Sequence, residues 1–308
     1  MMKLQLRHLM DGLVGLMPAA FWTYIFKTFW RRPEFAQRAG YTVYPRTYYN
    51  PFPLDEEIDL AKLRGRRELP GIDLRVPQAM ELLKELGHYR DELEQFPKDK
   101  EGRIEWWMTY PTLDSYILYT LLRHLKPRRY IEVGCGFSTR VSTAALRKNK
   151  EEGIDCEAVF IEPYPGDRLK GLVLKGQFFE QKIQDVSLEI FEKLEAGDVL
   201  FIDTSHVLKA QSDTEHEFLR ILPRLKPGVL VHVHDIFTPY DYPEEWIVGR
   251  GPNLGANNEQ YALECLISGG SWEILLPLHF LLRDHRENIE NHFGLFTDRS
   301  QAFWIQKR

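Results

Sequence analysis

Short apolar runs alternate with helical patterns of apolar residues from residue 112 to the C-terminus. The apolar runs predict strands at 129–133, 158–162, 177–183, 198–203 and 229–235, with two later candidates at 272–276 and 302–306. Apolar residues at helical spacing predict helices at 112–125, 138–148, 187–195, 211–224 and 258–268. This alternation predicts an α/β fold with a doubly wound, mostly parallel sheet. Ligands of such sheets bind outside the carboxyl ends of the strands, where the strand order reverses.

The first hundred residues lack this alternation. Residues 77–96 have the apolar spacing of an amphipathic helix, and residues 31–75 are rich in Arg, Pro and Tyr, as in an extended connection. A charged segment containing a glycine follows at 98–103. We therefore place a domain boundary near residue 100, between a helical and irregular N-terminal extension (1–100) and a strand–helix domain (101–308).

Residues 9–30 are strongly apolar and rich in aromatic side chains. Asp11, Pro18 and Lys27 interrupt the segment, and its uninterrupted apolar runs are too short to span a bilayer. We expect a helix that packs on the domain or on a partner subunit, and the aromatics between residues 20 and 50 favour a homo-oligomer. Two alternatives stay open. One is peripheral membrane contact by an interfacial helix, since two arginines follow the aromatic end, and the other is a cleaved or spanning segment.

The composition is that of an ordinary soluble protein. The 308 residues are 44% hydrophobic and 28% charged. The net charge of -5 argues against a nucleic-acid-binding surface. The three cysteines (Cys135, Cys156, Cys265) are scattered, with neither a disulfide framework nor zinc spacing. We therefore expect the protein to be located in the reducing cytoplasm, with membrane association as an alternative.

The stretch 129–138, RYIEVGCGFS, carries the most specific local signal. Its apolar run stops at Gly134 and Gly136, which let the backbone approach a ligand where any Cβ would intrude. Ser138 is suited to cap the following helix, whose free N–H groups face whatever lies over the turn. Glu132 precedes the turn and can reach back as an acceptor. A nucleotide-like cofactor is the natural occupant of such a turn.

The order E-x-G-x-G-x-S, with no third glycine, disfavours a dinucleotide fold. It resembles motif I of the class I S-adenosylmethionine-dependent methyltransferases. The resemblance implies a Rossmann-like, seven-stranded sheet and S-adenosylmethionine as cofactor, held at the glycine turn. In that family an acidic residue after the second strand holds the ribose hydroxyls, and Glu162 in FIEP stands there. The adenine amino group is held after the third strand, where Gln184 and Asp185 stand, although Asp185 is equally suited to cap the next helix.

Ionisable residues end two further predicted strands. Asp203 and His206 follow the fourth strand in FIDTSH, and His234 and Asp235 end the fifth in VHVHD. We expect these four to converge beside the cofactor. Asp203, His234 and Asp235 are a candidate ligand set for Mg²⁺ or Mn²⁺, with His206 as the base that takes the proton of a hydroxyl. His232 is more simply a histidine of the core.

The segments RYIEVGCGFST, FIEP, FIDTSH and LKPGVLVHVHDIF resemble a narrower subfamily, the macrolide-sugar O-methyltransferases and the cephalosporin hydroxylase relatives. The resemblance implies O-methylation of a hydroxylated small molecule or glycan, with Asp203 and His206 at the spacing of that subfamily's metal ligand and base. The pair after the fifth strand is His234-Asp235 instead of two acids. Two other functions stay open: an iron-dependent hydroxylase on the same fold, and a catalytically silent scaffold.

The segment 236–257 exceeds the usual length of a connection and predicts a lid or substrate loop. Tyr240, Tyr242 and Trp246 are suited to stack on a ring of the substrate or to anchor the loop. Glu259, at the start of the following helix, is a further residue that could face the site.

Overall fold

The computed structural model describes residues 16–45, 47, 53–106, 108–166, 169, 172, 176–248, 257–294 and 299–308. The chain divides into two compact units, Met1–Ile58 and Asp59–Arg308. The boundary expected near residue 100 lies inside the second unit. The buried residues of helix α5 (Val76–Gly87) belong to the same hydrophobic core as the strands, so residues 59–100 are part of that unit.

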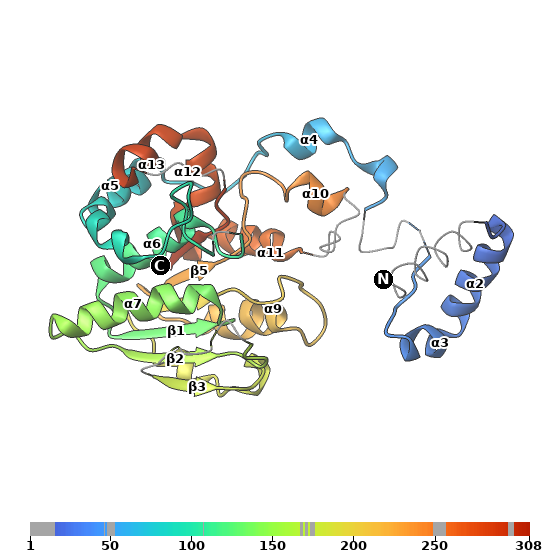
Figure 1. Ribbon diagram of the computed structural model, residues 1–308, viewed down its shortest axis with the longest axis horizontal. Coiled ribbons are helices and arrows are strands. Elements are labelled where there is room, and N and C mark those ends of the chain that lie inside the picture. The colour runs from blue at the N-terminus through green and yellow to red at the C-terminus, as the bar shows by residue number, and fades with distance from the viewer. Residues whose placement is uncertain are drawn as a thin grey trace. The chain divides into compact units, whose positions relative to one another are not determined.

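The second unit contains a seven-stranded sheet with the order β3-β2-β1-β4-β5-β7-β6 (Figure 1). The strands are β1 (Arg129–Val133), β2 (Glu157–Ile161), β3 (Gln177–Phe179), β4 (Val199–Ile202), β5 (Leu230–Val233), β6 (Trp272–Pro277) and β7 (Phe303–Lys307). β1 is parallel to β2 and β4, whereas β7 is antiparallel to β5 and β6. The prediction of an α/β fold with a seven-stranded, mostly parallel sheet is confirmed. The strand order reverses at β1, so the carboxyl ends of β1 and β4 form the switch point at which ligands bind.

Helices cover this sheet, and α6 packs against both α5 and α7. The first unit contains α2 (Ala19–Arg31), α3 (Pro33–Arg38) and the 3₁₀ turn η1 (Asp55–Glu57). Besides α5, the second unit contains α4 (Leu60–Arg64), η2 (Arg90–Gln95), α6 (Thr112–Leu125), α7 (Phe137–Glu151), η4 (Ile183–Asp185), α8 (Glu189–Glu192), α9 (Asp213–His216), η5 (Glu217–Ile221), η6 (Leu222–Arg224), α10 (Glu244–Ile247), α11 (Glu259–Leu266), η7 (Ile267–Ser271), α12 (Leu278–Asp284) and α13 (Arg286–Phe293).

The helix at 112–125 and the strand at 129–133 have the predicted bounds. Other predictions differ from the structure. Residues 31–75, predicted as an extended connection, contain the helices α3 and α4. The helix predicted at 211–224 is divided into α9, the π-helical η5 and the 3₁₀ turn η6, which contains Pro223, a residue without a backbone N–H. The strand predicted at 177–183 ends at Phe179.

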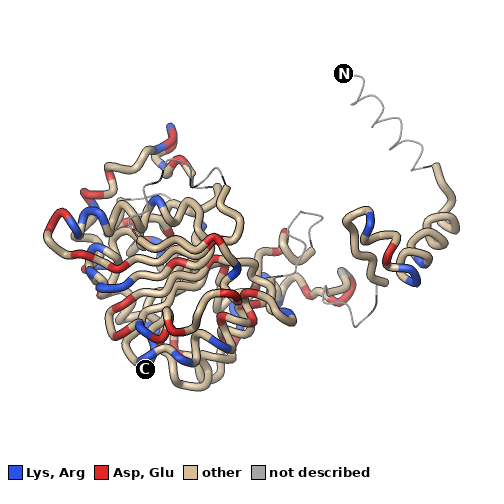
Figure 2. The backbone as a smooth tube through the Cα atoms, turned by 90° about the horizontal axis from the view of Figure 1, so that it is seen from below, with Lys and Arg blue, Asp and Glu red and all other residues tan. Residues whose placement is uncertain are grey.

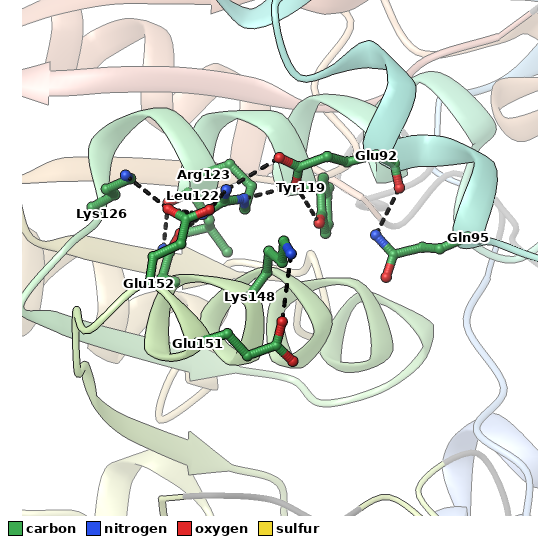
Figure 3. Close-up of polar contacts among 10 residues, drawn as sticks. Glu92, Gln95, Tyr119, Leu122, Arg123, Lys126, Lys148, Glu151 and Glu152 are labelled. Carbon is green, nitrogen blue, oxygen red and sulfur yellow. Dashed lines mark hydrogen bonds and ion pairs between the residues drawn. The ribbon is translucent and has the colours of Figure 1, made fainter.

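A buried arginine on α6 joins three helical segments (Figure 3). Nε of Arg123 lies 2.8 Å from Oε2 of Glu92 in η2, and its guanidinium also contacts Glu152, the residue that caps α7. Lys126 pairs with the same Glu152 at 3.0 Å, and the hydroxyl of Tyr119 donates to Glu92 at 2.7 Å. This network fixes η2, α6 and α7 relative to one another.

Candidate functional site

A cavity of about 800 Å³ opens at the carboxyl ends of β1 and β4. Its wall includes the turn Gly134–Ser138, the segment Asp203–His206, Glu162 after β2, and His234 and Asp235 after β5. The cavity therefore lies at the switch point that the sheet order defines, and it is lined by residues from the four central parallel strands.

Gly134 is required by the packing of the turn. Its φ is +84°, and a Cβ built on it would lie 1.7 Å from the carbonyl oxygen of Asp203. Only glycine therefore lets the turn after β1 pass this close to the end of β4. The N–H of Gly134 donates to the carbonyl of Ile161 at 3.0 Å, which fixes the turn against β2 as well. Gly136 also lines the cavity.

Glu132 does not line the cavity. It is fully buried behind the turn, where its carboxylate accepts hydrogen bonds of 2.7–2.9 Å from the hydroxyls of Tyr130, Ser138, Thr139 and Ser142. Burial raises the pKa of Glu132, while these hydroxyls act in the opposite direction. The structure thus places Glu132 as the residue that organises the turn and the start of α7, and not as a direct contact of a ligand in the cavity. Ser138 lines the cavity, but its hydroxyl is directed to Glu132.

Glu162 lines the cavity, as expected. Its carboxylate accepts from the backbone N–H of Cys135 at 3.1 Å and from that of Tyr164 at 2.7 Å, so it is fixed against the glycine turn. Gln184 also lines the cavity and donates to the carbonyl of Gln211 at 3.0 Å. Asp185, by contrast, is exposed and does not belong to the wall, because the short turn η4 carries it away from the opening.

The four ionisable residues after β4 and β5 converge, as the sequence predicts. Nε2 of His206 lies 3.3 Å from Oδ1 of Asp203 and 3.4 Å from Oδ2 of Asp235. Nδ1 of His234 lies 3.6 Å and 3.4 Å from oxygens of the same two carboxylates. Each imidazole therefore faces both carboxylates. His206 and Asp235 adopt left-handed backbone conformations, with φ of 60° and 57°, which turn the chain as it leaves each strand.

Two further carboxylates support these imidazoles from behind. Glu259, at the start of α11, contacts Nδ1 of His206, and Asp114 on α6 lies 3.2 Å from Nε2 of His234. Both carboxylates are buried. Sequence reasoning found Glu259 only as a residue that could face the site. It missed Asp114, which lies 120 positions before His234 and looks like an ordinary acidic residue in the first turn of a helix.

The carboxylates determine the charge of both imidazoles. Burial by itself lowers a histidine pKa, but Glu259 and its neighbours raise the pKa of His206 well above its usual value. Asp203 and then Asp114 raise the pKa of His234 to about 10 against the same effect of burial. Burial likewise raises the pKa of Asp203, yet the two histidines hold it well below its ordinary value. At neutral pH the cluster therefore contains imidazolium cations paired with carboxylates.

The predicted Mg²⁺ or Mn²⁺ ligand set (Asp203, His234, Asp235) does not fit a metal ion. In the part of the chain that the structure describes, no group of three or more His, Cys, Asp or Glu is arranged to hold one. The reason is visible in the geometry. The rings of His206 and His234 face the oxygens of Asp203 and Asp235 at 3.3–3.6 Å, so the carboxylates of the set already have imidazole partners.

Other aromatic residues near the site have structural partners. His232 is buried in the core and stacks on Phe201 with ring centroids 4.0 Å apart, in agreement with the expectation for it. The hydroxyl of Tyr240 donates to Asp284 at 2.6 Å, and the hydroxyl of Tyr242 accepts from the N–H of Gln260, so both tyrosines anchor their loop. Trp246 lines the cavity, while residues 249–256 of the predicted lid lie outside the described residues.

The wall also contains residues from the C-terminal part of the chain that the sequence did not indicate, Arg299 and Gln301. The N–H of Gln301 donates to Asp114 at 2.9 Å, and the hydroxyl of Ser300 contacts the same carboxylate. The segment that leads into β7 is thereby held beside His234, which explains how a part of the chain so distant in sequence reaches the site.

Fold and site together define a ligand-binding α/β domain with a glycine turn and an acid–base cluster at its switch point. Residues 131–236, about a third of the chain, match the family model described as "Methyltransferase domain". This segment runs from β1 to just beyond β5 and contains the glycine turn and the four converging ionisable residues. This segment of the chain is therefore similar to a methyltransferase domain.

Individual relatives add little to the family match. An uncharacterized protein of Archaeoglobus fulgidus is 29% identical over 164 residues, which cover 49% of this chain and 73% of the relative. Among solved structures, the plantazolicin methyltransferase BpumL in complex with SAH has a TM-score of 0.36 and 14% sequence identity, over 74% of this chain and 98% of that one.

Proposed function

We propose that this methyltransferase transfers a methyl group from S-adenosylmethionine to a hydroxyl group of a small molecule or glycan, with His206 as the general base. The observation that supports the proposal is the position of His206. It lines the same cavity as the glycine turn and has a buried carboxylate, Glu259, at its other ring nitrogen. This is the arrangement in which a carboxylate orients an imidazole and stabilises the cation that forms when it accepts a proton.

The cavity has the features that the cofactor requires. S-adenosylmethionine supplies an electrophilic methyl group on a sulfonium. The turn Gly134–Ser138 provides a wall without side-chain bulk, and the fixed carboxylate of Glu162 retains lone pairs that suit ribose hydroxyls. Gln184 lies on the same wall and provides an amide for the adenine. Asp185 has no part in this assignment, because it lies outside the wall.

The acceptor hydroxyl would lose its proton to Nε2 of His206 as its oxygen forms a bond to the methyl carbon. The methyl–sulfur bond breaks in the same step, and its electron pair remains on the sulfur of the demethylated product. Glu259 holds Nδ1–H and stabilises the resulting imidazolium. Asp203 and Asp235 lie beside the same imidazole at 3.3 Å and 3.4 Å and place compensating negative charge around it.

The raised pKa of His206 has a kinetic consequence. A general base must be neutral before it accepts a proton, and the carboxylates around His206 keep it protonated at neutral pH. The rate of methyl transfer is therefore expected to rise with pH through the pKa of His206, so the enzyme should work best under alkaline conditions. A bound acceptor that moves one of the neighbouring carboxylates away from His206 would lower this pKa and have the same effect.

The proposal is tested by turnover of the purified protein with S-adenosylmethionine and a panel of hydroxylated acceptors, with formation of the demethylated cofactor as readout. His206→Asn is expected to bind S-adenosylmethionine within about twofold of wild type and to lose about 10²–10⁴-fold in turnover. His88→Asn, at an exposed histidine on the end of α5, is the matched control and should keep full activity. Full turnover by His206→Asn would remove His206 as the base, and a protein that does not bind the cofactor would refute the whole proposal.

A further inference from the structure

Helix α2, in the first unit, has two different faces. Apolar side chains recur every four residues in two adjacent rows, Phe21, Ile25, Phe29 and Trp22, Phe26, Trp30. The opposite side carries Thr23, Lys27 and Arg31 at the same spacing. Residues four apart lie one above the other on a helix, so the rows are continuous stripes along its axis. The helix is therefore amphipathic, with an aromatic side and a basic side.

The aromatic side is not covered. No residue of α2 is buried, and the exposed fractions are 41% for Phe21, 51% for Phe26 and 53% for Trp30. The ring of Trp22 contacts both Phe21 and Phe26, with ring centroids 5.3 Å and 6.0 Å apart, so the three side chains form one patch. Single exposed apolar residues are common, but a contiguous aromatic patch marks an interaction surface.

The charge of this segment is opposite to that of the chain as a whole. Residues 16–45 contain Lys27, Arg31, Arg32 and Arg38 against one acidic residue, Glu34, a net charge of +3, whereas the whole chain carries -5. These charges are coloured along the tube in Figure 2. The segment 16–32 contains no acidic residue. An anionic surface is therefore the complementary partner, and a second copy of α2 would bring like charges together.

We propose that α2 binds an anionic lipid bilayer surface, lying in the plane of the interface with its aromatic rows among the lipids and its lysine and arginines toward the phosphates. Aromatic residues on one face and basic residues on the other are the pattern of interfacial helices. The 13 residues of α2 extend only about 20 Å, less than the thickness of the hydrocarbon region. In the described parts of the chain no helix has the length and apolar character needed to cross a bilayer.

Two side chains of the helix fit this environment in a further way. The hydroxyls of Thr23 and Thr28 donate to the carbonyls of Ala19 and Tyr24 at 2.9 Å and 2.8 Å. Their hydrogen-bonding groups are thus satisfied within the helix, which lowers the cost of bringing them near the lipid. The proposal concerns where the enzyme acts and is independent of its chemistry.

The test is flotation of the full chain with vesicles of phosphatidylcholine, with and without phosphatidylglycerol, at low and high salt. Binding is expected to vesicles that contain phosphatidylglycerol and to weaken at high salt. Lys27→Gln/Arg31→Gln should lower the partition coefficient about 30-fold, since each basic residue near an anionic surface contributes about fivefold. Its control, Lys84→Gln/Lys193→Gln, removes the same charge from exposed lysines of the second unit and should bind like wild type.

The aromatic side is tested by Phe26→Glu/Trp30→Glu, which should abolish vesicle binding, against Leu219→Glu at an exposed leucine of η5, which should not. Unchanged affinity for S-adenosylmethionine in these variants would show that the second unit is intact. The proposal is overturned if wild type does not float with anionic vesicles, or if the α2 variants float as well as their controls. It is also overturned if the α2 variants convert a wild-type dimer into monomers in solution, because a second copy would then occupy the patch.

Discussion

The contact between Glu259 and His206 gives the sharpest prediction about the site. Glu259→Gln removes the negative charge at Nδ1 of His206 but keeps an oxygen that accepts Nδ1–H, so the ring orientation is retained. Both side chains are well shielded, with exposed fractions of 1% for Glu259 and 15% for His206, so solvent screens the interaction little. The substitution should therefore lower the pKa of His206.

The magnitude follows from the energy of a charge-assisted hydrogen bond. Such a bond contributes roughly 1.5–3 kcal/mol, and one pKa unit corresponds to about 1.4 kcal/mol. The pKa of His206 is thus expected to fall by about 1–2 units in Glu259→Gln. Because the neutral base then forms at lower pH, the rising limb of the pH–rate profile should move down by the same amount.

The assay is an NMR titration of protein labelled with ¹³C-histidine, with His206→Asn to assign the signal. The control is Glu264→Gln, on the same helix, whose carboxylate pairs with Arg67 instead of a histidine. It should leave the titration of His206 unchanged. An unchanged or raised pKa in Glu259→Gln would refute the argument that Glu259 stabilises the imidazolium.

Three further substitutions test how the site is supported. Gly134→Ala should lower the free energy of unfolding by about 3 kcal/mol or more, because its Cβ meets the carbonyl of Asp203. The control Gly197→Ala has a similar φ of +86° but open space around the new Cβ, and it should cost about 1–2 kcal/mol. Equal thermal unfolding temperatures of the two variants would contradict the packing argument. Arg123→Ala leaves Glu92 without its cation and Glu152 with Lys126 alone, and it should cost about 3 kcal/mol in urea unfolding. A loss below about 1 kcal/mol would mean that the network is screened like a surface pair. His234 has a folded-state pKa of about 10, above its unfolded value of 6.5. The stability that its protonation gives to the fold is therefore complete below pH 6.5 and is lost as the pH rises toward 10. In His234→Asn this fall in stability should be smaller, and an identical pH dependence would show that His234 is not a buried cation.

The sequence predicted those parts of the fold whose signals are local. The strand β1 and the helix α6 have the predicted bounds, because an abrupt glycine turn ends the first and Lys126-Pro127 ends the second. The convergence of Asp203 and Asp235 was predictable because the carboxyl ends of neighbouring parallel strands meet at one sheet edge. Helix α12 was missed because its apolar residues directly continue the apolar run of β6. Helix α13 was missed because Ile289 and Phe293 are its only apolar residues.

What the sequence could not show was which partner each carboxylate would find. Asp114 is buried against His234, Ser300 and Gln301, all more than a hundred positions away, and no local pattern marks it. Glu132 was expected at the cofactor, yet four hydroxyls surround it in the core. Local spacing drew attention to Glu132 and gave no reason to notice Asp114, whereas the role of each side chain depends on its tertiary contacts.

The central claim is that the glycine turn and Glu162 form a metal-independent S-adenosylmethionine site, and calorimetric titration of the cofactor into metal-stripped protein tests it most directly. We predict micromolar binding of one cofactor per chain, unchanged by added Mg²⁺ or Mn²⁺. Glu162→Ala should weaken it about tenfold, since the loss of a hydrogen bond to a charged group costs about 1.5 kcal/mol or more, and Asp185→Ala should leave it unaltered. No binding, or binding only after metal is added, would contradict the account.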